Sequence, residues 1–334
     1  MHAIRQHKAG GNLVSESVPV PLPGAGEVLV KMQASPINPS DLALLKGNYL
    51  ARKYPFIPGL EGSGVVVSSG GGMLAGARVG KRVACTPDPV GDGTWADYMK
   101  TSVMRTVPIP RTTSFEEGAM MLVNPMTAMA LVQIAKKGKY RAIVNNAAAS
   151  ALGKMLIRLT NRYEIPLINI VRREEQVTEL KSMGATHVLN SEEGSFESTL
   201  KQHAHELGAN LILDALSGAQ TSLLLRAAPR GSTLITYGRL SGDPVLVDPG
   251  ILIKEEKQIT GFQLGNWLQS KSMTFKLRFI SHVKKNLSDT LLTHIDRRMP
   301  LEKVEEALAL YSKNMSAGKI ILTINPSRMK DPSK

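Results

Sequence analysis

Residues 144–153 read Val-Asn-Asn-Ala-Ala-Ala-Ser-Ala-Leu-Gly, and this stretch decides the fold because it joins a strand to a helix. A short apolar run at 142–145 leads into it, and a helical pattern over 151–161 follows it. Against G-x-G-x-x-G, which places a pyrophosphate at a helix N-terminus, Ala148 and Ser150 replace the first two glycines and only Gly153 remains. The motif alone is weak, and a small-residue helix start without a ligand stays open as the alternative.

A turn with these replacements can still bind a nucleotide. Alanine and serine are small enough to let backbone amides and a helix N-terminus approach a pyrophosphate, and the glycine lets the helix pack on the strand. We therefore expect a dinucleotide cofactor to contact Ala148, Ser150, Ala151, Leu152 and Gly153.

Strands and helices alternate on the C-terminal side of this turn. Strands are expected at 142–145, 167–171, 188–189, 211–214 and 232–236, and helices at 151–161, 174–183, 196–207 and 221–227. Repeated β-α-β units of this length predict a parallel sheet with helices on both faces. The predicted fold class is α/β, with a doubly wound domain.

The N-terminal third follows another pattern. It is rich in Gly and Pro, and short strands are expected at 27–32, 64–67 and 80–84. Turn signals at short spacing predict a compact β-barrel-like domain here. The segment 116–135 that follows is rich in Met, Ala and Leu and is expected to carry a long helical stretch.

The pattern loosens after about residue 260, and 265–275 is expected to be a loop. An amphipathic helix at 301–311 precedes a last strand at 319–323, which is predicted to return to the first domain. The polar tail 326–334 is expected to fray. The predicted domains are residues 1–118 with 263–334, and residues 119–262.

Composition narrows the function classes. The chain has 334 residues, of which 43% are hydrophobic, so a disordered protein is excluded. Its single cysteine excludes a disulfide framework and a Cys-rich zinc site. No signal peptide and no apolar span of about 20 residues is evident, so a soluble, cytoplasmic protein without a membrane partner is expected.

The charge balance favours acidic partners. Lysine plus arginine is 41 and aspartate plus glutamate is 28, so 41 − 28 gives a net charge of +13. The basic stretches, such as 136–139, are short, and aromatics are only 4% of residues, which disfavours nucleic-acid binding. A solvated basic surface and attraction of a phosphate-bearing substrate or an acidic carrier protein stay open.

The second strand of the nucleotide domain favours one cofactor over another. An NAD site usually places an acidic residue at the end of this strand for the ribose hydroxyls. Here Val171 is followed by Arg172 and Arg173, and guanidinium groups suit a 2′-phosphate. NADP(H) is therefore expected; the alternative is a surface arginine pair matched to Glu174 and Glu175.

Several motifs together resemble the medium-chain dehydrogenase/reductase superfamily. They are Pro36-Ile37-Asn38-Pro39-Ser40-Asp41, Gly47-Asn48-Tyr49, residues 57–64 (Ile-Pro-Gly-Leu-Glu-Gly-Ser-Gly), residues 124–128 (Asn-Pro-Met-Thr-Ala), Gly261-Phe262-Gln263-Leu264 and Gly318-Lys319-Ile320-Ile321-Leu322. The resemblance spans nearly the whole chain. It implies a GroES-like catalytic domain, a Rossmann cofactor domain and a homodimer formed through residues near 245–260.

Departures from the zinc enzymes of that superfamily point to a zinc-free branch. Their Cys ligand falls at Asn38, their His ligand at Leu60 and a further ligand near Asn124. Asparagine and leucine do not complete a zinc ligand set. Cys85 is the sole cysteine and is expected to be a small buried thiol, so no metal site is predicted.

Within that branch the chain looks most like the mitochondrial-type trans-2-enoyl thioester reductases and the quinone oxidoreductases. The former share the I-N-P-[SA]-D and G-N-Y motifs, and their tyrosine maps onto Tyr49 as the catalytic side chain. Their G-F-W-L motif becomes Gly-Phe-Gln-Leu here, so a tryptophan is lost at Gln263. Trp267 is expected to line the same pocket.

The resemblance implies roles for further residues. Hydride is delivered to the β-carbon of an activated C=C bond, and Tyr49 donates a hydrogen bond or a proton to the resulting enolate. Asn38 is expected to assist catalysis by positioning the substrate. The residues expected at the cofactor are Thr127, Tyr237, Gly238, Phe262, Leu264 and Lys319.

Three functions remain open from the sequence. The first is an NADPH-dependent, zinc-independent reductase of enoyl thioesters or enones, with acyl-CoA or acyl carrier protein as the substrate's carrier. The second is an NADPH:quinone oxidoreductase, which needs only an open apolar pocket. The third is a nucleotide-binding sensor without turnover.

Overall fold

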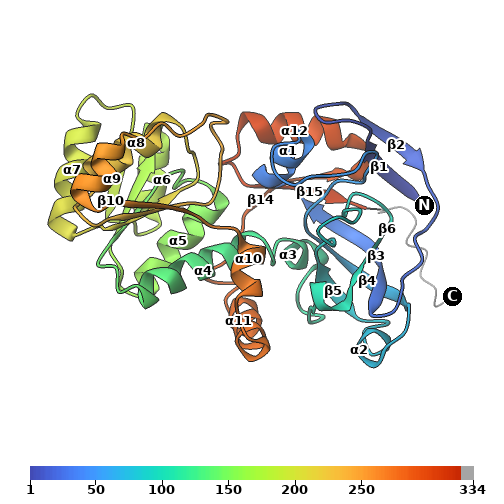
Figure 1. Ribbon diagram of the computed structural model, residues 1–334. Coiled ribbons are helices and arrows are strands. Elements are labelled where there is room, and N and C mark those ends of the chain that lie inside the picture. The colour runs from blue at the N-terminus through green and yellow to red at the C-terminus, as the bar shows by residue number, and fades with distance from the viewer. Residues whose placement is uncertain (325–334) are drawn as a thin grey trace. The chain divides into compact units, whose positions relative to one another are not determined.

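The computed structural model describes residues 1–324, so the predicted fraying of 326–334 concerns residues outside the described part. The chain forms two compact units (Figure 1). The first comprises Met1–Val123 and Thr293–Lys334, and the second comprises Asn124–Leu292. The second unit thus extends to Leu292, whereas the predicted boundary lay at 262. The difference is the segment that contains the two helices at Leu264–Gln269 and Met273–Lys285.

A mixed seven-stranded sheet forms the first unit. Its order is β14-β15-β3-β4-β5-β7, with β6 also paired to β3. Its strands are β3 (Glu27–Pro36), β4 (Gly62–Ser69), β5 (Arg82–Cys85), β6 (Tyr98–Ser102), β7 (Thr106–Pro108), β14 (Ile295–Pro300) and β15 (Lys319–Thr323). The last strand, β15, pairs antiparallel with β3, with Leu322 opposite Ser35, so the expected return of the chain is observed.

Smaller elements complete the first unit. They are β1 (His2–Gln6), β2 (Leu13–Ser17), α1 (Pro39–Leu45), α2 (Met73–Gly76), α3 (Phe115–Ala119), α12 (Val304–Lys313) and the 3-10 turns η1 (Val103–Arg105) and η2 (Leu301–Lys303). The core is continuous from the first strand to the last: Ile4, Met32, Trp95 and Leu322 belong to one buried cluster. Burial of this apolar surface is the main force that holds the unit together.

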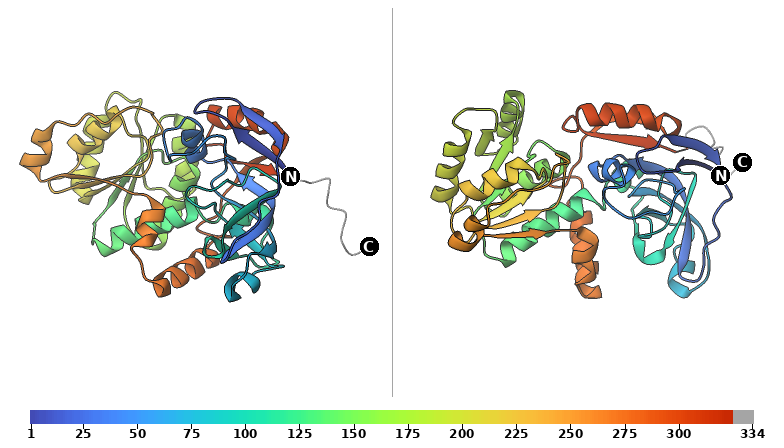
Figure 2. Two further views of the ribbon diagram at one scale, coloured as in Figure 1. Left: turned by 45° about the vertical axis from the view of Figure 1, so that its right-hand side comes forward. Right: turned by 45° about the horizontal axis from the view of Figure 1, so that its top comes forward.

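The second unit is a six-stranded parallel sheet in the order β10-β9-β8-β11-β12-β13, flanked by helices (Figure 2). Its strands are β8 (Ile143–Asn145), β9 (Leu167–Val171), β10 (His187–Asn190), β11 (Leu211–Asp214), β12 (Thr233–Thr236) and β13 (Gln258–Gly261). Its helices are α4 (Asn124–Lys137), α5 (Ala151–Arg162), α6 (Glu174–Ser182), α7 (Phe196–Leu207), α8 (Ala219–Ala227), α9 (Pro249–Glu255), α10 (Leu264–Gln269) and α11 (Met273–Lys285). Every residue of β9 and β11 is buried, as a sheet covered on both faces requires. The predicted α/β class with a doubly wound domain is confirmed.

The long helical stretch predicted within 116–135 is present as α4, but it does not fill the segment, because residues 120–123 separate α3 from α4. The cause is the carboxylate of Glu61, which accepts the backbone amides of Leu122 (3.1 Å) and Val123 (2.9 Å). Pro125 lies in the first turn of α4, where its missing N–H costs no helical hydrogen bond.

The loop predicted at 265–275 is wrong, because α10 and α11 occupy most of it. The side chain of Gln263 accepts the amide of Asn266 (2.7 Å) and so caps α10. Arg158 of α5 donates to the carbonyls of Thr290 (3.0 Å) and Leu292, which keeps this hairpin with the second unit.

Candidate active site

The turn between β8 and α5 has the shape of an anion cradle. Ala147 adopts a φ of +50°, in the left-handed region, and the amide of Ala148 donates to Ile170 O (3.2 Å). Ser150 is the N-cap of α5, where its hydroxyl accepts the amide of Gly153 (3.1 Å). The predicted small residues thus build a tight, capped helix start.

Gly153 has no room for a side chain. A Cβ at this position would lie 2.3 Å from the carbonyl oxygen of Ala148. The amides of Ala151 and Leu152 belong to the first turn of α5, where no carbonyl four residues back can accept them. Two free donors at the positive end of a 12-residue helix fit a phosphate group.

Polar residues that the sequence analysis missed hold the neighbouring loops. The side chain of Asn146 donates to Asp214 (2.6 Å) and accepts the amide of Ala215 (2.7 Å). Asp214 also accepts the hydroxyl of Thr221 (2.6 Å). Asn146 directly follows β8 and Asp214 ends β11. That position was the available signal, since the ends of parallel strands converge on the ligand side of an open sheet.

Two buried polar side chains at this edge have no partner within residues 1–324: both polar atoms of the Asn145 amide and the hydroxyl of Tyr237. Burial, with the nearby charge of Asp214, raises the pKa of Tyr237. Gly238 is required next to it, because a Cβ there would lie 2.7 Å from Ala215 O. An unpaired buried donor or acceptor costs free energy unless a ligand or water satisfies it.

Arg172 and Arg173 follow β9 and are exposed. The backbone amide of Arg172 donates to the side chain of Gln176 (3.2 Å), while its guanidinium forms no salt bridge with any described residue. The alternative of a surface arginine pair matched to Glu174 is therefore not seen for Arg172. An exposed guanidinium that follows the end of β9 suits a 2′-phosphate.

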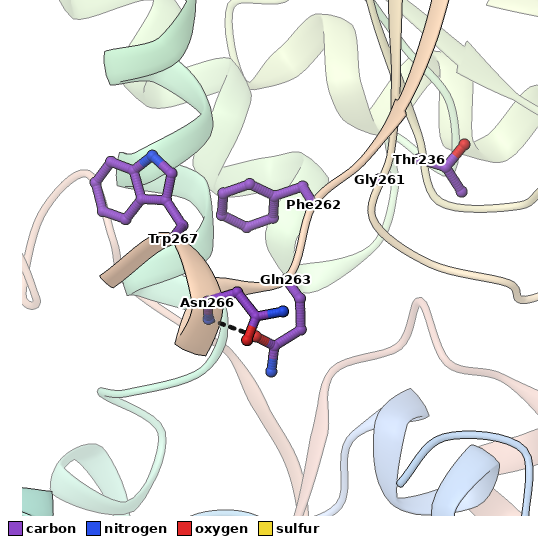
Figure 3. A pocket seen from close by; sticks show the side chains of 6 residues that line it. All are labelled: Thr236, Gly261, Phe262, Gln263, Asn266 and Trp267. Atoms are coloured by element: carbon purple, nitrogen blue, oxygen red, sulfur yellow. Dashed lines mark hydrogen bonds between the residues drawn. The ribbon is translucent and has the colours of Figure 1, made fainter. Parts of the chain in front are cut away.

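A pocket of about 480 Å³ lies at the end of β13 and the start of α10 (Figure 3). It is lined by Thr236, Gly261, Phe262, Gln263, Asn266 and Trp267. The rings of Phe262 and Trp267, both lining residues, are tilted to each other with centroids 6.3 Å apart. Leu264 is the first residue of α10 and is not a lining residue. Elsewhere in this unit, Thr127 is buried in the first turn of α4.

In the first unit, Asn38 is the centre of a buried polar network. Its side chain donates to Glu61 (2.8 Å) and accepts from the ammonium of Lys319. Lys319 also donates to Ile37 O (3.0 Å) and lies 3.4 Å from the hydroxyl of Tyr311. Lys319 is only 2% exposed, and its three donors all have partners inside the unit.

Burial sets the titration of this network. It raises the pKa of Asp41 to about 7, although the amides of Asn38 and Leu60 and the Lys319 charge oppose the shift. Burial likewise raises the pKa of Glu61 and lowers that of Lys319 to about 8, while each carboxylate favours the charged lysine. Two carboxyl groups and one ammonium therefore share one dry site.

The structure separates the predicted site residues into two kinds. Asn38 and Lys319 are brought together and fully engaged, so neither side chain is free to bind a cofactor. Tyr49 lies four residues beyond α1 and is 43% exposed. Its hydroxyl has no hydrogen-bond partner among the described residues and is available to a ligand.

The described residues offer zinc no ligand set. Across residues 1–324 no group of three or more His, Cys, Asp or Glu side chains is placed to hold a metal ion. Cys85 is buried in β5, with Sγ 3.6 Å from Gly62 O, and burial raises the pKa of its thiol. The described helices include none that is long and apolar enough to cross a bilayer.

Two family models match the chain. Residues 24–111 match the alcohol dehydrogenase GroES-like domain, and residues 151–282 match the zinc-binding dehydrogenase domain. These matches agree with the β-rich first unit and the parallel sheet of the second.

Named relatives and solved structures extend the similarity over almost the whole chain. The mitochondrial enoyl-[acyl-carrier-protein] reductase of Mus musculus is 30% identical over 89% of this chain and 81% of that protein. The Homo sapiens protein is 29% identical over the same shares. A crystal structure of a candidate NADPH:quinone reductase from Mesorhizobium loti is 33% identical, with a TM-score of 0.88, over 97% of this chain and 98% of that one.

Proposed function

The chain belongs to the medium-chain dehydrogenase/reductase superfamily as an NAD(P)H-dependent oxidoreductase of the enoyl reductase/quinone reductase type, and we propose that it uses NADPH to reduce the C=C bond of 2-enoyl thioesters or smaller enones. The observation that carries this proposal is the similarity at 30% identity to enoyl-[acyl-carrier-protein] reductases, together with Tyr49, whose exposed hydroxyl is free to meet an acceptor.

The cofactor part of the proposal rests on the second unit. The amides of Ala151 and Leu152 would bind the pyrophosphate, and Arg172 with Arg173 would bind a 2′-phosphate. The hydroxyl of Tyr237, unpaired in the described chain, would donate to the cofactor. A bound nicotinamide supplies hydride to the β-carbon of the acceptor.

The chain's own residues then handle charge and protons. Negative charge develops on the carbonyl oxygen as hydride arrives, and the phenol of Tyr49 donates a hydrogen bond or a proton to the enolate. Asn38 does not reach the acceptor in this scheme, because its side chain is bonded to Glu61 and Lys319. It acts by holding the start of α1, the helix that leads to Tyr49.

The second candidate is an NADPH:quinone oxidoreductase, favoured by the 33% identity to the Mesorhizobium loti structure. Oxidation of NADPH against crotonyl-CoA and a small quinone in parallel, with NADH as the control, separates the two. Turnover of crotonyl-CoA with NADPH preferred supports the enoyl reductase. Turnover of the quinone alone assigns the chain to the second candidate, and binding of NADPH without turnover on either acceptor supports a sensor.

We also propose that the chain forms a homodimer through β13. The cytoplasm is the proposed compartment. All four residues of β13 are exposed at the end of the six-stranded sheet. Leu246 and Ile253 nearby are 78% and 77% exposed. An open, partly apolar edge strand is a template for pairing with another chain. Light scattering that gives a monomer mass would contradict this assembly.

A further inference from the structure

Helix α11 carries positive charge that nothing nearby in the sequence balances. From Phe262 to Ser288 the chain contains five lysines and arginines and no aspartate or glutamate. Arg278 and Lys285 are exposed. The next acidic residue, Asp289, lies 3.6 Å from Arg162 and is therefore already paired. Helix α11 thus presents a basic surface to solvent.

Apolar side chains lie among these charges. On the outward side of α11, Leu277 is 63% exposed and Met273 is 49% exposed. Arg278 and Lys285 are seven residues apart, which places them two turns apart on one side of the helix. The other side is occupied, because Phe279 and Val283 are buried. We call the set of Met273, Leu277, Arg278 and Lys285 the α11 face.

The side of α11 opposite to the α11 face packs against a residue that lines the pocket. The ring of Trp267, which lines the pocket, contacts Phe275 (5.7 Å between centroids) and Phe279 (5.3 Å), both on the inward side of α11. Any molecule seated on the outward side is therefore one helix diameter, about 10 Å, from the pocket wall.

We propose that the α11 face docks an acidic carrier protein that bears the enoyl thioester, so that the acyl group reaches the pocket from a protein and not only from a free ester. The inference rests on the proposed function. The positive residues from Lys276 to Lys285 extend over about 14 Å of helix, which suits a negatively charged helix on a partner. Met273 and Leu277 lie toward the N-terminal end of this face and add exposed apolar area beside the charged residues, as interfaces that combine apolar and charged contacts do.

An anionic membrane fits the same surface less well. A helix that lies on a bilayer turns its apolar face toward the lipid. The apolar face of α11 is instead packed inward, and only Met273 and Leu277 are left to insert.

The test uses a double variant of the α11 face that carries both Arg278→Glu and Lys285→Glu. The matched control is a double variant that carries both Lys81→Glu and Arg111→Glu. It changes the net charge by the same amount at two exposed residues of the first unit. Steady-state kinetics use a 2-enoyl acyl carrier protein and, in parallel, the N-acetylcysteamine thioester of the same acyl group. We expect KM for the carrier substrate to rise about tenfold in the α11 variant alone, with kcat/KM for the small thioester within about twofold of the unmodified protein.

The proposal would be overturned if KM for the carrier substrate rose equally in both double variants, or if the α11 variant lost as much kcat/KM on the small thioester as on the carrier substrate. It would also be overturned if the α11 variant kept its KM for the carrier substrate but no longer sedimented with phosphatidylglycerol vesicles. Anisotropy of a fluorescent carrier protein bearing a saturated acyl chain measures docking without turnover. If the enzyme reduces no enoyl thioester but still binds this probe through the α11 face, the proposed function fails and the docking surface stands. If it reduces the small thioester and does not bind the probe, the docking surface fails alone.

Discussion

Two places in the molecule, one in each unit, treat their buried polar groups in opposite ways. Around Asn38 in the first unit, amide, carboxylate and ammonium groups are paired with one another inside the protein. At the carboxyl edge of the parallel sheet in the second unit, the Asn145 amide and the Tyr237 hydroxyl are buried without partners among residues 1–324. A closed network stabilises a scaffold, whereas unpaired groups at the carboxyl ends of parallel strands, where ligands bind open sheets, are available to a ligand.

This difference separates residues that sequence motifs treat alike. Asn38, Lys319 and Tyr49 all belong to segments that resemble the superfamily, yet only Tyr49 presents an unpaired hydroxyl at the surface. Lys319 and Asn38 are therefore expected to act on stability and on the position of α1, and Tyr49 on the acceptor. Five changes test that division.

The largest effect is expected from Lys319→Met. Removing the ammonium leaves two buried carboxyl groups without their cation, which costs about 3–5 kcal/mol in the free energy of unfolding. Lys257→Met is the matched control, because Lys257 is also buried but its partner Glu255 is 45% exposed and stays hydrated. Urea unfolding measures the free energy of unfolding of both variants. Equal losses would show that the closed network contributes no more to stability than the pair of Lys257 and Glu255.

Tyr49→Phe should lower kcat with crotonyl-CoA by about 100-fold and leave the Kd for NADPH unchanged, because only the donor to the enolate is lost. Tyr54→Phe is the control, since Tyr54 is a similarly exposed tyrosine at 36%. Full activity of Tyr49→Phe on the thioester would show that the Tyr49 hydroxyl has no catalytic role and that the residue only lines the acceptor site.

Gly153→Ala tests the cradle in the second unit. The added Cβ meets the Ala148 carbonyl at 2.3 Å, so the backbone of the turn must move, at a cost of about 1–3 kcal/mol. We expect a lower Tm and weaker NADPH binding in a fluorescence titration. Gly194→Ala, which meets no atom within 4 Å, should leave both unchanged. Unaltered NADPH binding in Gly153→Ala would remove the turn from the cofactor site.

Arg172→Ala combined with Arg173→Ala tests the choice of cofactor. Loss of a charge-assisted contact to the 2′-phosphate should weaken NADPH binding about tenfold and leave NADH binding unchanged. Isothermal titration with both nucleotides measures this difference. A parallel loss for NADH would mean that the arginines support the fold of α6 and not the phosphate.

Asp41→Asn tests the closed network through the pH dependence of stability. Folding raises the pKa of Asp41 from 3.8 to about 7, so the native state holds an extra proton between these values. The contribution of this group to stability is full below pH 3.8 and is lost as the pH rises toward 7. Urea unfolding from pH 4 to pH 7 should show a flatter dependence in the variant. An identical slope would assign the pH dependence to other groups.

Much of the second unit could be predicted because its signals are local. Strands at 167–171 and 211–214 and the helix at 196–207 have the predicted bounds, since buried parallel strands are continuous apolar runs and helices show their own period. The interruption of the helical stretch at 116–135 could not be predicted from its own residues. This break depends on Glu61, which is distant in sequence and bonds the amides of residues 122 and 123.

By itself the sequence determined the order of the elements, the small-residue turn ending at Gly153 and the arginines after the second strand, because apolar periodicity and turn chemistry act over a few neighbouring residues. Only the tertiary structure decided what Asn38 and Lys319 do. They are 281 residues apart, and the fold places both in a dry interior, where each polar group must find a partner. Burial and pairing, which motifs do not encode, separate the residues that support the site from those left free to bind.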